Sequence, residues 1–271
     1  MFEWLLSPPV GVFFVCLFLG AVVGILAGLL GIGGGLLVVP AMHFLLPMLG
    51  VAQENVMPMA LATSLATIIL TSGAAARHHW QAGNVDVRLS LLLIPGMVLG
   101  GLAGSSLVEW LPVELLPKVF ASIVLFLALQ MGLSLRSTAS ASLPHNIICM
   151  LVGGIIGTLS TLAGIGGGSL TVPYLHRHGI AMRNAIACSA VTGGVIALSG
   201  LIGFTYYGLH EGALPVGTFG YVYLPAWMGI VLTSTYTSRF GVRWASQWPT
   251  AKLKRFFALF LLAISIKMFL G

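Results

Sequence analysis

The stretch "GLLGIGGGLLVVP" at residues 28–40 places three consecutive glycines and then a proline inside an otherwise apolar segment. A near-copy, "TLAGIGGGSLTVP", occupies residues 161–173. Each glycine inside a helix costs roughly 1 kcal/mol relative to alanine, so both runs favour an interruption of the helix. Two such interruptions at matching places of one chain indicate an internal duplication.

The chain around these runs is very apolar. Of its 271 residues, 58% are hydrophobic and 7% are charged, and the mean hydropathy is +1.04. A soluble domain carries about a quarter charged residues. The composition therefore predicts an all-α polytopic membrane protein whose surroundings are the lipid bilayer. The net charge of +6 is typical of the basic loops of such a protein and predicts no nucleic-acid partner.

Apolar segments form two groups of five, on either side of the polar stretch "RSTASASLPHN" at 136–146. When residues 20–40 are aligned on 153–173, more than half of the positions are identical. This predicts two repeats in one integral membrane domain, residues 1–138 and 139–271, with eight to ten membrane segments. The segments at 36–50 and 169–180 are short against a hydrocarbon core of about 30 Å, so they either re-enter or span as broken elements. The ten segments are 10–31, 36–50, 57–76, 88–109, 115–134, 146–164, 169–180, 184–207, 215–237 and 253–270.

Basic residues predict the orientation of the chain. If the N-terminus lies outside and every segment crosses once, all of the 12 Lys and Arg residues except Lys118 and Lys267 fall on the cytoplasmic side. This distribution is the one that the positive-inside rule requires. Because each half then has an odd number of crossings, the second repeat is inverted relative to the first, an architecture common among secondary transporters.

The glycine runs are the candidate substrate site. Unwound backbone is tolerated in the bilayer interior only against protein or a polar cavity, and N–H groups beside a helix N-terminus bind anions. Each proline disfavours helical angles at the preceding valine and suits the first turn of a new helix, so Pro40 and Pro173 are expected to mark the helix breaks. Two interpretations of the runs remain, close helix packing and an anion cradle. The cradle would consist of Gly33, Gly34, Gly35, Gly166, Gly167 and Gly168.

Hydroxyl groups at repeated positions are the second set of candidates. Thr63 and Ser64 of "ALATS" align with Cys188 and Ser189 of "AIACS". Ser169 directly follows the second run and has the type and place of an N-cap. Such hydroxyls either donate to substrate oxygens or bond to carbonyls of their own helix, the commoner fate of a membrane serine. The predicted substrate-binding hydroxyls are those of Thr63, Ser64, Ser169, Ser189 and Thr192.

Other chemistry is not indicated by the sequence. An intramembrane enzyme would need paired carboxylates or a nucleophile with a partner base. Neither pattern is found, so no enzymatic activity, catalytic residue, cofactor or metal site is predicted. No Asp or Glu falls at mid-membrane depth as a coupling group. An inside-negative potential favours anion exit by about 2.3 kcal/mol per charge per 100 mV, so export of an anion needs no coupling ion.

Five stretches resemble the sulfite exporter TauE/SafE family, also called the TSUP family of anion transporters. They are the paired "GIGGG…VP" runs, "ALATSLATIILTS" at 60–72, "GNVDVRLSLLLIPGMVLGGLAGSSL" at 83–107, and "LLPKVFASIVLFLALQM" at 115–131. The resemblance covers nearly the whole chain and implies a bacterial inner-membrane transporter of sulfite, sulfonates or related sulfur-containing anions. The expected function is a secondary transporter in the exporting direction, with a small anion bound near the two runs at the membrane midplane. The alternatives are a non-transporting membrane anchor or assembly partner, and a uniporter or importer of a different oxyanion.

Overall fold

The computed structural model describes residues 8–30, 34–132, 143–212, 214–245 and 250–270. This part of the chain is all-α, with ten helices and one small hairpin, which confirms the predicted fold class. In chain order the elements are α1 (Pro8–Leu30), α2 (Gly35–Met48), α3 (Gln53–Gln81), α4 (Val87–Trp110), α5 (Leu116–Gly132), α6 (Asn146–Leu162), α7 (Gly168–Arg177), α8 (Met182–His210), β1 (Thr218–Phe219), β2 (Val222–Tyr223), α9 (Leu224–Ala245) and α10 (Thr250–Leu270).

Several helices have the length and composition of membrane segments. Among the described residues, α3, α4 and α8 are each long and apolar enough to cross a bilayer. Shorter apolar helical stretches are Gly11–Leu26, Gly35–Met48, Leu116–Gly132 and Asn146–Leu162. Apolar side chains also cover outer faces; Phe18 is 75% exposed and Leu151 is 64% exposed. Such faces suit lipid and not water, and the chain is a multi-pass membrane protein.

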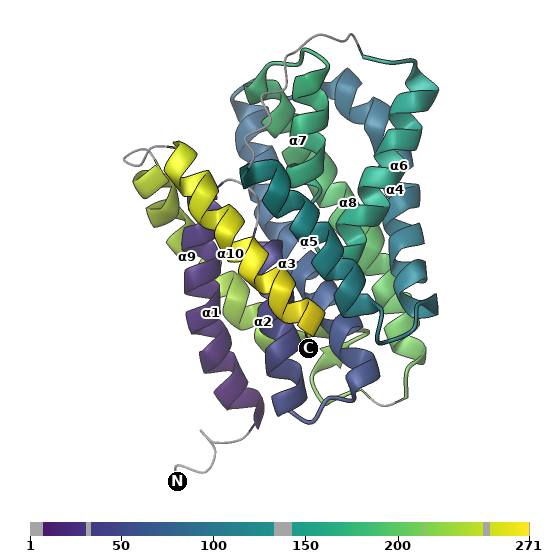
Figure 1. Ribbon diagram of the computed structural model, residues 1–271, viewed down its shortest axis with the longest axis vertical. Coiled ribbons are helices and arrows are strands. Elements are labelled where there is room, and N and C mark those ends of the chain that lie inside the picture. Colours follow the sequence, from purple (N-terminus) through teal and green to yellow (C-terminus); the bar gives the residue numbers. More distant parts are fainter. Residues whose placement is uncertain (1–7, 31–33, 133–142, 213, 246–249, 271) are drawn as a thin grey trace.

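Helix packing joins elements that are far apart in the sequence. α1 packs along α9 and α4 along α6, while α3 and α8 pack on each other. Figure 1 shows α1 and α9 on one side of the bundle and α4 and α6 on the other. α2 packs on α3, α7 packs on α8, and α5 packs on α10. If α1 to α5 are matched in order with α6 to α10, the contact of α1 with α9 corresponds to that of α6 with α4, and the contact of α2 with α3 corresponds to that of α7 with α8. The contacts of α3 with α8 and of α5 with α10 each join two matched helices.

The central helices α3 and α8 are antiparallel. Leu65 on α3 lies against Gly200 on α8, and Ser72, two turns further along α3, lies against Gly193, two turns earlier in α8. Glycines at these positions allow the close approach of the two helices. The residues of the first half of α3 are buried, from Asn55 to Ile68.

The hairpin replaces part of a predicted apolar segment. The sequence predicts one segment over 215–237, but α9 begins only at Leu224. Residues 218–223 instead form an antiparallel hairpin in which Thr218 lies opposite Tyr223. Gly217 and Gly220 adopt φ of +92° and +55°, which no helix accommodates, and this explains the late start of α9.

The structure also corrects the expected place of the helix breaks. Pro40 and Pro173 lie inside α2 and α7, whose first residues are Gly35 and Gly168. A proline one and a half turns into a helix removes only one helical N–H bond, which both short helices tolerate. The second break falls at the glycines because Gly167, like Gly164 before it, has a left-handed φ, of +71° and +59° respectively.

Candidate functional site

The two glycine runs lie against each other in the interior. A side chain at Gly35 would overlap the carbonyl oxygen of Gly164. The Ser64 hydroxyl on α3 donates a hydrogen bond of 2.7 Å to that same oxygen and lies 3.4 Å from the carbonyl oxygen of Gly35. Gly33, a predicted site residue, lies outside the described residues. We call this contact, formed by Gly34, Gly35, Ser64 and residues 164–168, the glycine junction.

The first run contributes an apolar, closed side to the glycine junction. Gly34, Gly35 and the five residues that follow are all buried. Gly34 is the N-cap of α2 and has φ −73° and ψ −7°, in the helical region, and its carbonyl accepts the N–H groups of Leu37 and Val38. No hydroxyl-bearing residue stands in α2. The described part of the first run therefore serves packing.

Two unpaired hydroxyl groups lie beside the second run. Ser160 and Thr171 are both 0% exposed, and a Cβ atom added at Gly167 would lie 3.5 Å from Ser160 Oγ and 3.5 Å from Thr171 Oγ1. Among the described residues neither hydroxyl has a hydrogen-bond partner. The hydroxyls of Ser169 and Thr161 also lack one, but Thr161 Oγ1 lies against α8, 3.1 Å from a Cβ built on Gly200. A buried donor without a partner costs about 1–3 kcal/mol, so the two hydroxyls beside Gly167 call for a bound group.

The backbone of the second run presents N–H groups at the same place. On one side, the N–H groups of Gly164 and Ile165 donate back to carbonyls of α6; on the other, those of Leu170 and Thr171 donate to the carbonyl of Gly167. The N–H groups of residues 166–169 lie between, and no described residue accepts them. They form the N-terminus of α7, which carries about half a positive charge and attracts anions.

The other predicted hydroxyls divide into two groups. Ser189 on α8 reaches the second run, since its Oγ lies 3.1 Å from a Cβ built on Gly168. Thr63 does not, because its Oγ1 accepts the N–H of Tyr223 in the hairpin at 3.1 Å. Thr192 is also engaged elsewhere and donates to the Cys188 carbonyl of its own helix at 3.0 Å.

Ser169 lies in the second run but is not the N-cap that the sequence predicts. It is the second residue of α7, and Gly167 is the N-cap. The left-handed φ of Gly167 turns the chain into the helix two residues earlier than a serine cap would. The Ser169 hydroxyl is consequently one of the unpaired groups of the second run.

Sequence reasoning missed Ser160, Thr171 and Ser72. Ser160 and Thr171 align with Ala27 and Val38 of the first half. The signal that could have found them was a hydroxyl present in only one half, whereas the candidate residues were chosen because hydroxyls recur in both halves. Ser72 lies near the end of "ALATSLATIILTS", on the side of α3 that faces Gly166. Its Oγ lies 3.4 Å from a Cβ built on that glycine.

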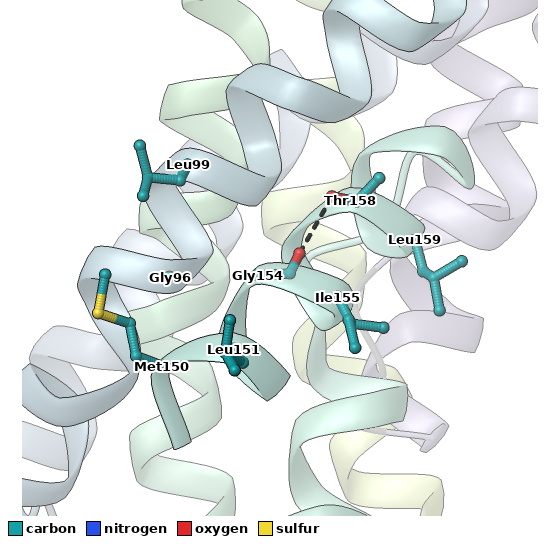
Figure 2. A pocket seen from close by; sticks show the side chains of 8 residues that line it. All are labelled: Gly96, Leu99, Met150, Leu151, Gly154, Ile155, Thr158 and Leu159. Atoms are coloured by element: carbon teal, nitrogen blue, oxygen red, sulfur yellow. Dashed lines mark hydrogen bonds between the residues drawn. The ribbon is translucent and has the colours of Figure 1, made fainter. Parts of the chain in front are cut away.

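An apolar groove between α4 and α6 is the other hollow of interest. Figure 2 shows its lining, which includes Leu99 and Ile155 with exposed fractions of 59% and 61%. The hydroxyl in this lining is that of Thr158, and it already donates to the carbonyls of Gly100 and Gly154. An anion would find no free donor there. In the part of the chain that the structure describes, no three His, Cys, Asp or Glu side chains gather as metal ligands do.

Comparisons with known proteins give the chain its family. It is 39% identical to a protein of Haemophilus influenzae named "Probable membrane transporter protein", over 94% of this chain and 97% of that protein. A protein of Methanocaldococcus jannaschii, also described as a probable membrane transporter, is 29% identical over 89% of this chain and 88% of its own length. No solved structure matches the chain. The sulfite exporter TauE/SafE family matches residues 16–268, and with a fold of apolar helices around a buried glycine junction the chain belongs to this family of membrane transporters.

Proposed function

We propose that the protein exports small sulfur-containing oxyanions, such as sulfite or an organosulfonate, and binds them at the N-terminus of α7. The observation that carries this proposal is that the buried hydroxyls of Ser160 and Thr171, which have no described partner, lie beside N–H groups that have no described acceptor. Sulfur oxyanions present only acceptor oxygens, so each of these donors gains a partner on binding. The positive end of α7 adds a favourable charge interaction.

The proposed site belongs to the second half of the chain. Ser160 and Thr171 have apolar counterparts in the first half. Ser64 of the first half already donates its hydroxyl hydrogen to the Gly164 carbonyl. The anion would therefore contact Gly166, Gly167, Gly168 and Ser169 from one side. Gly34 and Gly35 would close the other side by packing.

The halves 1–138 and 139–271 are proposed to act as two inverted repeats that rock against each other. The counterpart contacts, such as α1 with α9 and α6 with α4, support this arrangement. Alternating access between two repeats is the usual mechanism of such transporters. The proposed setting is the bacterial inner membrane with the N-terminus outside, where the potential alone favours anion exit.

The test is sulfite efflux from liposomes that contain the purified protein, in anaerobic buffer with an inside-negative potential. We expect efflux above that of protein-free liposomes, and competition by small sulfonates. The double variant Ser160→Ala/Thr171→Val should lose most of this flux, because it removes two donors from the site. The control Ser199→Ala should not, since the Ser199 hydroxyl bonds to the Ile196 carbonyl of its own helix.

Two results would contradict the proposal. Efflux no higher than background for sulfite and for a panel of sulfonates would favour a membrane anchor or assembly role. Full efflux through the double variant would leave the transport in place but remove the N-terminus of α7 as its binding site.

A further inference from the structure

The inward-facing residues of the second run are not all buried. Ser72 points at Gly166 and Gly193, and Ser189 points at Gly168, yet Ser72, Gly166 and Gly168 keep part of their surface exposed. The residues that the first run and Ser64 contribute to the glycine junction, Gly34, Gly35 and Ser64, are buried. An interior group that solvent reaches marks the side from which a ligand arrives.

The opposite side of the glycine junction is sealed by the hairpin. Tyr221 and Tyr223 are 2% and 4% exposed, and Thr63, which accepts the Tyr223 N–H, is 0% exposed. The Tyr221 hydroxyl also donates to the Glu109 carboxylate at 3.3 Å, which ties the hairpin to the end of α4. An anion at the second run has no exposed neighbour in this direction.

The exposed side leads to an end of the bundle that is rich in arginine. Ser72 lies between the glycine junction and the last turns of α3, where Arg77 stands, and α8 begins beside that end with Arg183. α4 begins and α7 ends at this same end. Each of the four helices carries one arginine there, and all four arginines are exposed. They are Arg77, Arg88, Arg177 and Arg183.

Negative charge is scarce at this end. Of the described acidic residues only Asp86 lies there, and its carboxylate accepts the N–H of Leu89 at the start of α4. The other described acids lie away from it; Glu109 stands in the last turn of α4 and Glu211 directly follows α8. A surface of one sign raises the local concentration of ions of the other sign.

From these observations we propose that Ser72 and Ser189 line the substrate's path, which runs from the arginine-rich end to the N-terminus of α7. The two hydroxyls would accompany the anion while it loses water, and the hairpin β1–β2 would keep the other end shut in this state. This inference rests on the proposed function, and it assigns Ser72 a contact with the substrate.

Cysteine labelling tests the path directly. Ser72→Cys and Ser189→Cys would be exposed to an impermeant, negatively charged thiosulfonate, in right-side-out cells and in inverted membrane vesicles. Ala82→Cys and Ala52→Cys are the side markers, because these exposed residues follow the arginine-rich end of α3 and precede its other end. The native cysteines Cys16, Cys149 and Cys188 are buried, and the parent chain gives the background.

We expect both path variants to react only from the side on which Ala82→Cys reacts. Ser199→Cys, a buried position on α8 toward the hairpin, should react from neither side. A small alkanesulfonate that competes with sulfite and does not react with thiosulfonates, at ten times its dissociation constant, should slow the labelling of Ser72→Cys about tenfold, as occupancy predicts, and leave Ala82→Cys unchanged.

Labelling of Ser72→Cys from the Ala52 side, or from neither side, would overturn the path. So would unchanged labelling of Ser72→Cys in the alkanesulfonate when that anion still competes with sulfite for transport by the variant. Sidedness of labelling does not require transport. Failure of the proposed function therefore appears as absent flux in the liposome assay, and failure of the path appears as the wrong labelling side.

Discussion

The hydroxyl of Ser64 on α3 donates a 2.7 Å hydrogen bond to the carbonyl oxygen of Gly164, one hundred residues later in the chain. This bond crosses between the two halves at the point where the second helix break begins. Gly164 has a left-handed φ of +59° just after α6, and no backbone N–H among the described residues donates to its carbonyl. A single side chain thus holds the break in place, and its removal has a defined consequence.

Ser64→Ala should lower the free energy of unfolding by about 1–3 kcal/mol, because it leaves the buried Gly164 carbonyl without that donor. Thermal unfolding of the purified protein in detergent measures the change. Ser122→Ala is the matched control, since the Ser122 hydroxyl bonds to its own helix on an exposed face, at the Lys118 carbonyl. Equal melting temperatures for the two variants would contradict the role of Ser64.

Gly35→Ala should destabilise the protein by about 1–3 kcal/mol through overpacking, because its Cβ would overlap the Gly164 carbonyl oxygen and lie 2.8 Å from Ile68 Cδ1. Gly73→Ala is the control within α3, where a Cβ meets nothing within 4 Å. That substitution should stabilise the helix by up to about 1 kcal/mol. If Gly35→Ala and Gly73→Ala shifted the unfolding curve of the parent in the same direction, Gly35 would not mark a close contact.

The sequence predicted the class of fold and the short helices after the glycine runs, while the place of the site stays a prediction. Periodic apolar segments and repeated glycines are local signals, and they sufficed for α2 and α7. The exact helix starts at Gly35 and Gly168 were not predictable from Pro40 and Pro173. Tertiary packing decided how much of each glycine run became helical.

The roles of individual hydroxyls were less predictable than the place of the site. Thr63 and Ser64 are adjacent and both buried, yet one accepts a hairpin N–H and the other bonds to the second run. Those partners are 160 and 100 residues away, and no spacing in the sequence encodes them. Ser160 became a candidate only when the structure brought its hydroxyl to Gly167.

Thr63→Val should lower the free energy of unfolding by about 1–3 kcal/mol, because the buried N–H of Tyr223 loses its acceptor. Thr63→Ser keeps the oxygen and should retain most of the stability. In the flux assay the folded fraction of either variant should show an unchanged KM for sulfite. A raised KM for Thr63→Val at normal stability would instead assign Thr63 to the substrate.

Gly167→Ala should abolish anion binding while the protein remains folded. Its Cβ would stand 3.5 Å from both Ser160 Oγ and Thr171 Oγ1 and 2.7 Å from Ile196 Cδ1, in the space that the proposed anion occupies. The left-handed φ of +71° adds about 1–2 kcal/mol of backbone strain. Gly179→Ala separates these two effects, since Gly179 has φ +81° but a Cβ there meets nothing within 4 Å.

Both variants should therefore melt at a lower temperature than the parent. Sulfite should still raise the melting temperature of Gly179→Ala, because ligand binding to the folded state stabilises it, and should leave that of Gly167→Ala unchanged. An equal rise for both variants would place the anion away from the N-terminus of α7.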